Sequence, residues 1–345
     1  SYTIDVYRGE LQPLRRWIDY LFYVSFFPGL VAGPIVRARD FIPQMFRTPV
    51  VTRETLGEGL YLIICGLLKK SVISDYISVN FVDRIFDAPT LYTGLENLVG
   101  AYGYALQIYC DFSGYSDMAI GIALLLGIRF NTNFDSPYQS ATITEFWRRW
   151  HISLSTWLKD YLYISLGGNR RGRVRTYVNL MLTMLLGGLW HGASGRFILW
   201  GGLHGAALAV HKFMMNHFPS FRPTGDTMSP LRRVCGVLIT FHVVCFGWIF
   251  FRADTMATGW DVIRQIFTAF HPEVFSQFVV GYTEVFLLIL GGYAIHFMPR
   301  VVDTTVRGWV TQSPTLVQAL YLTVAIIIVL QLKSADIVPF IYFQF

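Results

Sequence analysis

The chain has 345 residues, of which 53% are hydrophobic and 16% are aromatic, whereas only 14% carry a charge. An average soluble domain is about 25% charged, so these charged side chains are too few to cover a surface in water. Disordered chains are charged and poor in aromatic residues, so the same composition excludes disorder. The composition therefore predicts an integral membrane protein.

The net charge of +6 is concentrated in one part of the chain. Residues 129–175 contain eight basic and three acidic side chains, which places a charge of +5 in a single stretch between apolar segments. This positive-inside pattern predicts that the stretch lies on the cytoplasmic side, against membrane lipid headgroups. A contribution to binding an anionic donor is the other interpretation. A nucleic-acid surface is not predicted, because the positive charge is not spread as such a surface requires.

The chain opens with SYTIDVYRGELQPLRR, which contains neither an initiator methionine nor a signal peptide and indicates processing or a fragment. A helix that crosses the bilayer needs about 20 mostly apolar residues. About eight hydrophobic stretches follow, several of them short or interrupted: 17–36, 60–68, 98–128, 177–194, 197–211, 234–251, 285–299 and 308–332. They predict an all-α, polytopic membrane domain of tilted helices around a funnel, with short, re-entrant and interfacial helices among them.

The stretch 98–128 carries two acidic residues, Asp111 and Asp117, inside an apolar run. A charge at the bilayer centre costs about 2.5–3.5 kcal/mol on insertion scales, so both carboxylates are expected to face protein or water. Gly114 lies between them and predicts a break in the helix. A hydrogen bond to a neighbouring helix or to a buried arginine is the simplest role for both, and a direct part in chemistry is the alternative.

Residues 145–168, EFWRRWHISLSTWLKDYLYISLGG, combine aromatic and charged side chains at helical spacing. This pattern is typical of an amphipathic helix that lies in the membrane interface.

The four cysteines, Cys65, Cys110, Cys235 and Cys245, form no CxxC pair and lie in apolar runs. They are therefore predicted to be buried thiols rather than zinc ligands.

Three histidines lie where a buried reaction could use them: His151, His191 and His204. His191 ends an apolar run and precedes Gly192 and Gly195, which predicts an imidazole at a helix break, reachable from a cavity. Histidine is well suited to accept and return a proton near neutral pH. Capping of a helix end is the alternative role for His191, and packing through small residues is the simpler interpretation of His204.

The sequence lacks the motifs of several other catalytic mechanisms. It contains no G-x-S-x-G elbow, no HExxH pair and no Walker-type loop. What remains is a metal-free site with one or two histidines inside a membrane protein. Such a site suits acyl transfer from a thioester, which is already activated and needs only a base for the acceptor hydroxyl. General-base assistance typically contributes about 10²–10⁴-fold to such a step.

The run FWRRWHISLSTWLKDYLYISLGGNRRG, followed by LLGGLWHGASGRFILWGGLHG, resembles the membrane-bound O-acyltransferase (MBOAT) family. The resemblance is greatest to its bacterial branch of alginate O-acetyltransferases. Residues 27–44, 109–128 and 245–254 and the carboxy-terminal PFIYFQF extend the similarity over essentially the whole chain. The resemblance implies one MBOAT-like domain over residues 1–345, without the hydrophobic helices that precede it in full-length relatives.

The resemblance also implies roles for two histidines. His191 matches the family's invariant histidine, which lies deep in a channel, and His151 matches the second signature position. The implied activity takes acetyl groups from a cytoplasmic thioester donor, acetyl-CoA or another, with no permanently bound cofactor. It passes them across the bacterial inner membrane to an exported polysaccharide such as alginate, with periplasmic acetyltransferase partner proteins.

Other functions remain open at this point. D-alanyl transfer to teichoic acid uses the same chemistry in a related branch. A proton-coupled transporter would use Asp111, Asp117 and His191 as a proton relay. A non-catalytic scaffold predicts no loss of acetylation when His191 is replaced.

Overall fold

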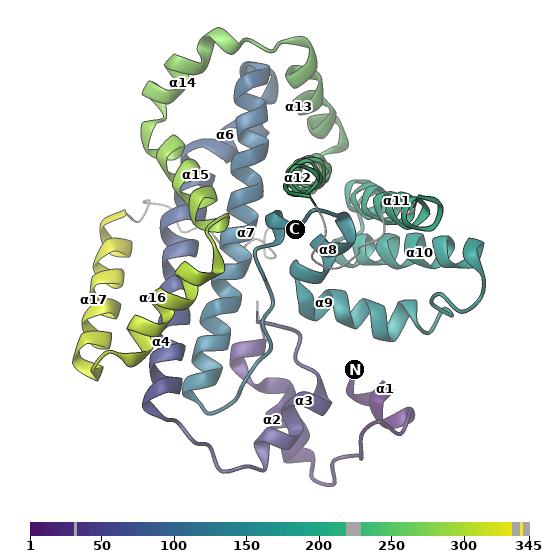
Figure 1. Cartoon of the computed structure of the whole chain (residues 1–345), viewed down its shortest axis with the longest axis vertical. Coiled ribbons are helices and arrows are strands. Elements are labelled where there is room, and N and C mark those ends of the chain that lie inside the picture. Colours follow the sequence, from purple (N-terminus) through teal and green to yellow (C-terminus); the bar gives the residue numbers. More distant parts are fainter. Residues whose placement is uncertain (31–32, 219–228, 333–338, 341–345) are drawn as a thin grey trace.

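The computed structural model describes residues 1–30, 33–218, 229–332 and 339–340, and every regular element in these ranges is a helix (Figure 1). The prediction of an all-α fold is confirmed. The amino-terminal part holds α1 (Tyr2–Tyr7), α2 (Trp17–Ser25), the 3₁₀ turn η1 (Phe27–Gly29) and α3 (Ala38–Met45). Stretch 17–36 is therefore not a single span, because α2 ends at Ser25 and the chain turns at Pro28.

The long helix α7 (Gly94–Leu125) runs through the centre of the molecule beside α4 (Arg53–Leu67) (Figure 1). A capping box starts α7: the Thr93 side chain accepts a hydrogen bond from the Glu96 amide, and the Glu96 carboxylate accepts one from the Thr93 amide. Its 32 residues include many that are buried, so α7 is the central element of the core.

The predicted break at Gly114 is wrong, because α7 is continuous through it. Gly114 instead faces Gly66 of α4. A Cβ atom at Gly114 would lie 2.8 Å from the Gly66 carbonyl oxygen, and one at Gly66 would lie 2.5 Å from the Gly114 oxygen. Only residues without a side chain allow two helix backbones this close, and small residues are typical of helix contacts in membranes.

After α4 the chain alternates between α- and π-helix: η2 (Leu68–Ser74, π), α5 (Asp75–Ile77), η3 (Ser78–Val82, π) and α6 (Asp83–Asp87). The 3₁₀ turn η4 (Pro89–Leu91) then leads into α7. A π-helical turn contains an extra residue and rotates the side chains that follow it. Two consecutive lysines, Lys69 and Lys70, lie in η2, where both point at α7.

These lysines neutralise the two intramembrane acids. Lys69 Nζ lies 2.6 Å from Asp117, and Lys70 Nζ lies 2.5 Å from Asp111 and 2.7 Å from Asp75. The expectation that Asp111 and Asp117 face protein is confirmed, although their partners are lysines and not arginine. The pairs join η2 to α7.

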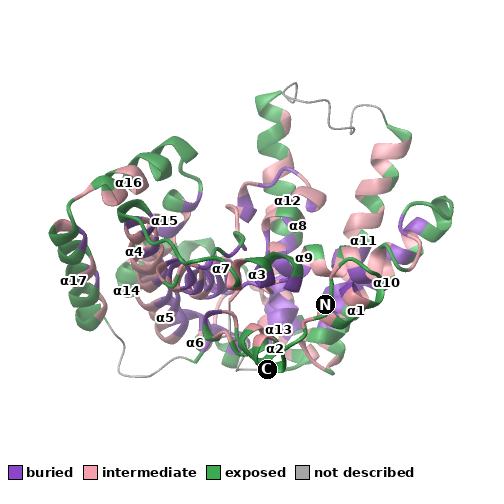
Figure 2. Ribbon diagram, turned by 90° about the horizontal axis from the view of Figure 1, so that it is seen from below, coloured by how far each residue is buried: buried purple, intermediate pink, exposed green. Residues whose placement is uncertain are grey.

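A second group of helices lies on the other side of α7 (Figure 1). It contains α10 (Arg173–His191), α11 (Gly195–His217) and α12 (Pro230–Arg252), with α12 against α7 itself. The helices α10 and α11 approach closely through glycines: a Cβ atom at Gly201 would lie 2.3 Å from the Met184 oxygen. Figure 2 shows the buried residues gathered where α7, α12 and the segment before α10 meet.

The carboxy-terminal part continues with α13 (Met256–Thr268), η9 (Pro272–Val274), α14 (Phe275–Gly281), α15 (Thr283–His296), α16 (Arg300–Gln312) and α17 (Thr315–Leu332). The predicted single span over 308–332 is wrong. It divides between α16 and α17 at Pro314, which lacks the amide hydrogen that a continuous helix would use.

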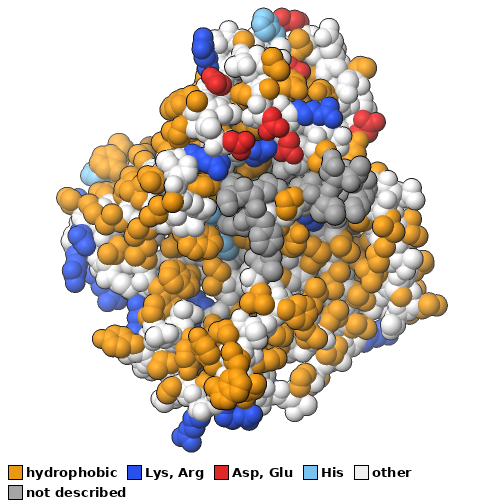
Figure 3. Space-filling model, turned by 180° about the vertical axis from the view of Figure 1, so that it is seen from behind, with side chains coloured by type: hydrophobic (Ala, Val, Ile, Leu, Met, Phe, Trp, Pro, Cys, Tyr) orange, Lys and Arg blue, Asp and Glu red, His pale blue; other side chains and the backbone are white. Residues whose placement is uncertain are grey.

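Among the described residues, α12 and α17 are each long and apolar enough to cross a membrane. The bent pair Pro272–Gly281 and Thr283–His296, with 99° between its halves, adds a third if it forms one span. The other predicted stretches form helices that are shorter or less apolar. Exposed apolar side chains cover α17, among them Leu316, Leu320, Ile327 and Leu330, and Figure 3 shows hydrophobic side chains over much of one face. These surfaces fit a protein embedded in lipid.

Candidate active site

The segment between α7 and α10 forms the first half of the candidate site. It contains the turn η5 (Pro137–Gln139), α8 (Ile143–Arg149), α9 (Ile152–Trp157) and the π-helical η6 (Leu158–Tyr163). The predicted single amphipathic helix over 145–168 is therefore wrong: α8 ends at Arg149, and His151 has the left-handed backbone angles φ 42° and ψ 56°. Such angles are uncommon outside glycine and turn the chain sharply.

The aromatic residues of this segment also differ from the prediction. Phe146 and Trp150 are buried, and the Trp150 ring lies 4.9 Å from the ring of Trp248 in α12. Both residues belong to the protein core and not to a belt at the membrane interface. The periodicity of aromatic and charged residues could not separate these cases, because both give an apolar helix face.

Asn133 holds the turn at His151 in place. The Asn133 carbonyl oxygen accepts a hydrogen bond from the Ile152 amide at 2.9 Å, and the Asn133 side-chain Oδ1 lies 3.1 Å from His151 Nδ1. Asn133 Oδ1 also accepts hydrogen bonds from the Ser153 amide at 3.2 Å and the Ser153 hydroxyl at 2.9 Å. Asn133 and His151 are both buried, so these contacts are protected from water.

His191 forms the second half of the candidate site. It is the last residue of α10, and the amide of Gly192 caps the helix end by donating to the Leu189 carbonyl at 3.2 Å. The predicted helix break at His191 is thus confirmed. The imidazole packs edge-on against Trp200 of α11 and Phe251 of α12, with ring centres 5.0 and 5.1 Å apart.

His151 and His191 line the same cavity. Its volume is about 10 Å³, close to the smallest space that can hold one water molecule. The rest of its wall is apolar or aromatic and consists of Ile108, Trp147, Trp150, Leu154, Trp200, Trp248 and Phe251. Two residues that are 40 positions apart in the chain, both named from the sequence, therefore meet at one place. The cavity is far narrower than the channel that the family resemblance implies.

His204 lies behind this cavity, in α11. Its ring is 4.8 Å from the ring of Trp200 and 5.1 Å from that of Trp147, two residues that do line the cavity. His204 is almost completely buried, and neither of its ring nitrogens has a hydrogen-bond partner among the described residues. Its position next to Gly247 of α12 agrees with the predicted packing role.

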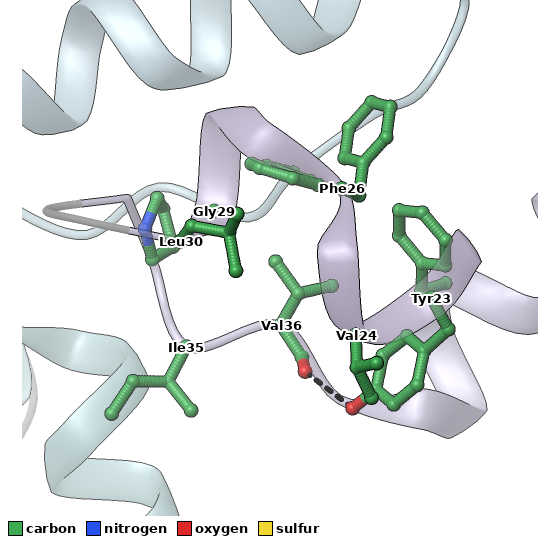
Figure 4. Close-up of a pocket in the computed structure, with 10 residues that line it drawn as sticks. Tyr23, Val24, Phe26, Gly29, Leu30, Ile35 and Val36 are labelled. Atoms are coloured by element: carbon green, nitrogen blue, oxygen red, sulfur yellow. Dashed lines mark hydrogen bonds between the residues drawn. The ribbon is translucent and has the colours of Figure 1, made fainter. Parts of the chain in front are cut away.

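A second, larger cavity lies in the amino-terminal part and is shown in Figure 4. It measures about 270 Å³ and is mostly apolar, with Phe26, Phe41 and Phe130 in its wall. The Tyr23 hydroxyl closes one side by donating to the Val36 carbonyl at 3.0 Å. The amide of Ile35, another wall residue, donates to Ser153 Oγ at 3.0 Å, which connects this cavity wall to the contacts around His151.

The basic turn before α10 lies on the molecular surface. Gly167, Gly168 and Gly172 have positive φ angles and shape the turn, and the four arginines between 170 and 175 are exposed.

Two of the four cysteines, Cys110 and Cys245, are buried as predicted, and Cys65 is partly buried. Cys235 is exposed on α12, so the prediction of a buried thiol is wrong there, since α12 turns that face outward.

Sequence reasoning missed Asn133 and Ser153. Asn133 lies in RFNTNFD, which has the composition of an ordinary polar turn, and nothing local marks it as a partner of a histidine 18 positions away. Its role depends on the pairing of residues 133–135 with 149–152, which the backbone bonds Ile152–Asn133 and Asp135–Arg149 establish at 2.9 Å each.

Comparison with known proteins places the site in the part of the chain that matches one enzyme family. The model of the membrane-bound O-acyltransferase family (MBOAT) matches residues 15–269, which include His151 and His191. A probable alginate O-acetylase AlgI from Azotobacter vinelandii is 46% identical over 268 residues, which cover 78% of this chain and 51% of the relative. A peptidoglycan O-acetyltransferase from Helicobacter pylori is 39% identical over 305 residues, 88% of this chain and 54% of the relative.

A teichoic acid D-alanyltransferase from Bacillus subtilis is 31% identical over 253 residues, 70% of this chain and 62% of the relative. The chain thus spans about half to three fifths of the lengths of these three relatives. The family match covers well over half of the chain and both candidate histidines. This chain belongs to the membrane-bound O-acyltransferase family.

Proposed function

We propose that this protein transfers acetyl groups from a thioester to an exported bacterial polysaccharide such as alginate. The observation that carries the proposal is the cavity between α8–α9, α10 and α12, where His151 and His191 meet within the part of the chain that matches the family. Two of the relatives named above are O-acetyl-transferring enzymes by name. Acetyl-CoA or another acetyl thioester is the proposed donor, and no permanently bound cofactor is needed.

The chemistry needs one base at the acceptor hydroxyl. His191 takes the proton of that hydroxyl while its oxygen attacks the thioester carbonyl carbon. The tetrahedral intermediate collapses with cleavage of the carbon–sulfur bond, and the leaving thiolate takes the proton back from His191. The products are an acetyl ester and a free thiol. His151 orients His191 or handles a second proton.

The small size of the cavity means that its walls must move before this reaction can occur. A space of about 10 Å³ holds one water molecule at most, so an acetyl group can enter only if side chains around the cavity move. Five of the nine lining side chains are Trp or Phe, from α8 and the residue that follows it, from α11 and from α12. Their exclusion of water protects the thioester from hydrolysis.

The proposed setting is the bacterial inner membrane, with residues 1–345 as one multi-pass domain. The exposed arginines between 170 and 175 are placed on the cytoplasmic side, against lipid headgroups and near the donor. Transfer then continues through periplasmic acetyltransferase partner proteins to the polysaccharide. D-alanyl transfer to teichoic acid is the second candidate, because one relative of 31% identity carries that name.

The test expresses the protein in a Pseudomonas strain that makes alginate but lacks its own O-acetylase. The acetyl content of the exported polymer is measured, together with the amount of folded protein in the membrane. The wild-type protein is expected to restore acetylation, and His191→Ala is expected to abolish it without loss of folded protein, because His191 lies at the end of α10 and at a cavity wall.

His217→Ala is the matched control. His217 also ends a helix, α11, but it is exposed, and its Nδ1 lies 2.9 Å from the Phe213 carbonyl oxygen. This variant is expected to acetylate like the wild type. Full acetylation by well-folded His191→Ala would refute the proposed base. Ester-linked D-alanine in teichoic acid, in a Bacillus strain lacking its own transferase, would favour the second candidate.

A further inference from the structure

The contacts of the Asn133 side chain determine which of its two terminal atoms is the oxygen. A backbone amide can only donate a hydrogen bond, and the Ser153 amide points at one terminal atom of Asn133 at 3.2 Å. That atom must therefore be Oδ1. The other terminal atom, Nδ2, donates to Ser116 Oγ of α7 at 3.0 Å, which fixes the amide from both sides.

The same contacts determine the protonation of His151. His151 Nδ1 lies 3.1 Å from Asn133 Oδ1, and an oxygen acceptor requires a hydrogen on the nitrogen. The Ser153 hydroxyl gives its only hydrogen to Asn133 Oδ1 at 2.9 Å, so at 3.4 Å from His151 Nδ1 it also acts as an acceptor there. The Asn133 oxygen thus requires the Nδ1–H form, and the contact with the Ser153 hydroxyl is compatible with it.

A neutral imidazole carries one hydrogen, so the other ring nitrogen is then a proton acceptor. We infer that Asn133 is a positioning residue that holds His151 in the Nδ1–H tautomer and leaves Nε2 as the basic nitrogen. This inference rests on the proposed function for its catalytic meaning: Nε2 belongs to the ring that lines the cavity together with His191. In that cavity His151 can accept a proton or hold His191 in the orientation that the reaction needs.

The surroundings of His151 support this assignment. The rings of Phe112 and Phe134 pack on the imidazole, with centres 4.6 and 6.4 Å away, and neither titrates. Among the described residues that line the cavity, His191 is the other titratable group. Asn133 is fully buried, so water does not compete for its oxygen. The left-handed backbone of His151 keeps the ring beside Asn133.

The tautomer can be measured without any substrate. The protein is reconstituted into lipid vesicles with nitrogen-15-labelled histidine, because protonated and unprotonated ring nitrogens give well-separated NMR signals. Comparison with His151→Asn identifies the signals of His151. The wild-type protein is expected to carry hydrogen on Nδ1 of His151. Hydrogen on Nε2 would overturn the inference.

Two variants of Asn133 test the consequence for acetyl transfer. Asn133→Ala removes the acceptor, so both tautomers of His151 are expected to be populated and kcat to fall roughly 10- to 100-fold with KM little changed, as when the partner that orients a functional histidine is lost. Asn133→Asp keeps an acceptor oxygen and adds a negative charge, which favours the imidazolium. It is expected to retain Nδ1–H and to move the acid limb of the pH–rate profile to higher pH.

The acid limb is expected to move to higher pH because only neutral His151 can accept a proton. A group that keeps its proton to higher pH becomes available as an acceptor only at higher pH. An acid limb that stays in place in Asn133→Asp, together with unchanged kcat in Asn133→Ala, would overturn the inference.

Asn97→Ala is the matched control for loss of a buried amide. Asn97 is also fully buried, but its Nδ2 partners in the described part of the chain are the backbone carbonyls of Pro89, Tyr92 and Thr93, at 3.0 to 3.2 Å. Its loss is expected to lower stability and to leave kcat per folded molecule and the His151 tautomer unchanged.

The failure of this inference differs from failure of the proposed function. If wild-type protein transfers no acetyl group but His151 carries hydrogen on Nδ1, the proposed function fails and the tautomer stands. If transfer depends on His191 but His151 carries hydrogen on Nε2, the inference about Asn133 fails alone.

Discussion

His151 combines a buried imidazole with a backbone conformation that most side chains avoid. The left-handed region costs roughly 1–2 kcal/mol for an ordinary residue, and Asn and Asp are the side chains that tolerate it best after glycine. Ser136, with φ 42°, is the other non-glycine residue with positive φ among the described positions, and it lies in the same segment. Strain of this kind persists where surrounding contacts hold it, here the bonds from Asn133.

This strain predicts different results for two substitutions of His151. His151→Asn keeps a residue that adopts the left-handed region and a side chain that can donate to Asn133 Oδ1. His151→Ala keeps neither. We expect His151→Ala to unfold more easily than His151→Asn by about 1–2 kcal/mol, from the left-handed cost alone.

The measurement is the thermal stability of both purified variants in one detergent, with acetyl transfer assayed in parallel. His151→Asn should retain more activity than His191→Ala, because an amide can still orient a neighbour although it cannot act as a base. Equal stability of the two His151 variants would show that the turn does not depend on left-handed tolerance.

At the level of elements, glycines determine how close the helices approach. The pair α10–α11 brings His191 and Trp200 together at the cavity, and its contact at Gly201 leaves no room for a side chain. The central pair α4–α7 uses Gly66 and Gly114 in the same way. In lipid, close packing of backbones replaces the hydrophobic effect as a source of helix association.

Gly201→Ala tests this packing. The added Cβ would lie 2.3 Å from the Met184 carbonyl oxygen, which is backbone and cannot swing aside. We expect a loss of stability of about 1–3 kcal/mol, the usual range for overpacking, and lower acetyl transfer because His191 shifts relative to α11. Gly291→Ala in α15 is the control, since no described atom beyond its own stretch of helix lies within 4 Å of its added Cβ. Stability is followed by thermal unfolding in detergent, and an unchanged melting temperature for Gly201→Ala would contradict the close contact.

At the level of the whole molecule, orientation in the membrane connects the site to its substrates. The exposed arginines between 170 and 175 lie at the amino-terminal end of α10, two just before the helix and two in its first turn, and α10 ends at His191. If they lie in the cytoplasm, α10 leads from the cytoplasmic surface to the cavity. The donor then reaches the cavity from the side of α10's amino terminus.

Cysteine labelling tests this orientation. Asn169→Cys places a thiol on the exposed basic turn at the loss of one surface hydrogen bond, from the Tyr163 hydroxyl. Cys235 is exposed and is replaced by alanine in the background protein, so that it does not react. We expect a membrane-impermeant maleimide to label Cys at 169 in inside-out vesicles and not in intact spheroplasts. Labelling of intact spheroplasts would reverse the orientation.

Composition and the order of apolar stretches were enough to predict a helical membrane protein, and local sequence was enough to propose His151 and His191 as site residues. Low charge and long apolar runs predict membrane helices because each residue contributes to burial in lipid independently of the others. The ends of α10 and α12 lie within four residues of the predicted stretches for the same reason, whereas α11 continues six residues beyond its predicted end. His191 could be named because glycines and a helix end mark it locally.

How these parts meet depends on contacts between distant segments. The sequence around Gly114 predicts a helix break. The backbone of Gly66 opposite it shows instead that Gly114 allows the two helices to pack closely. The sequence predicts Trp150 to lie at the membrane interface, but it is buried against Trp248, 98 positions away in the chain. The shared cavity of His151 and His191, and the bonds from Asn133, arise from contacts between segments far apart in the chain. Periodicity and composition describe a residue and its near neighbours, whereas these contacts depend on which helices pack together.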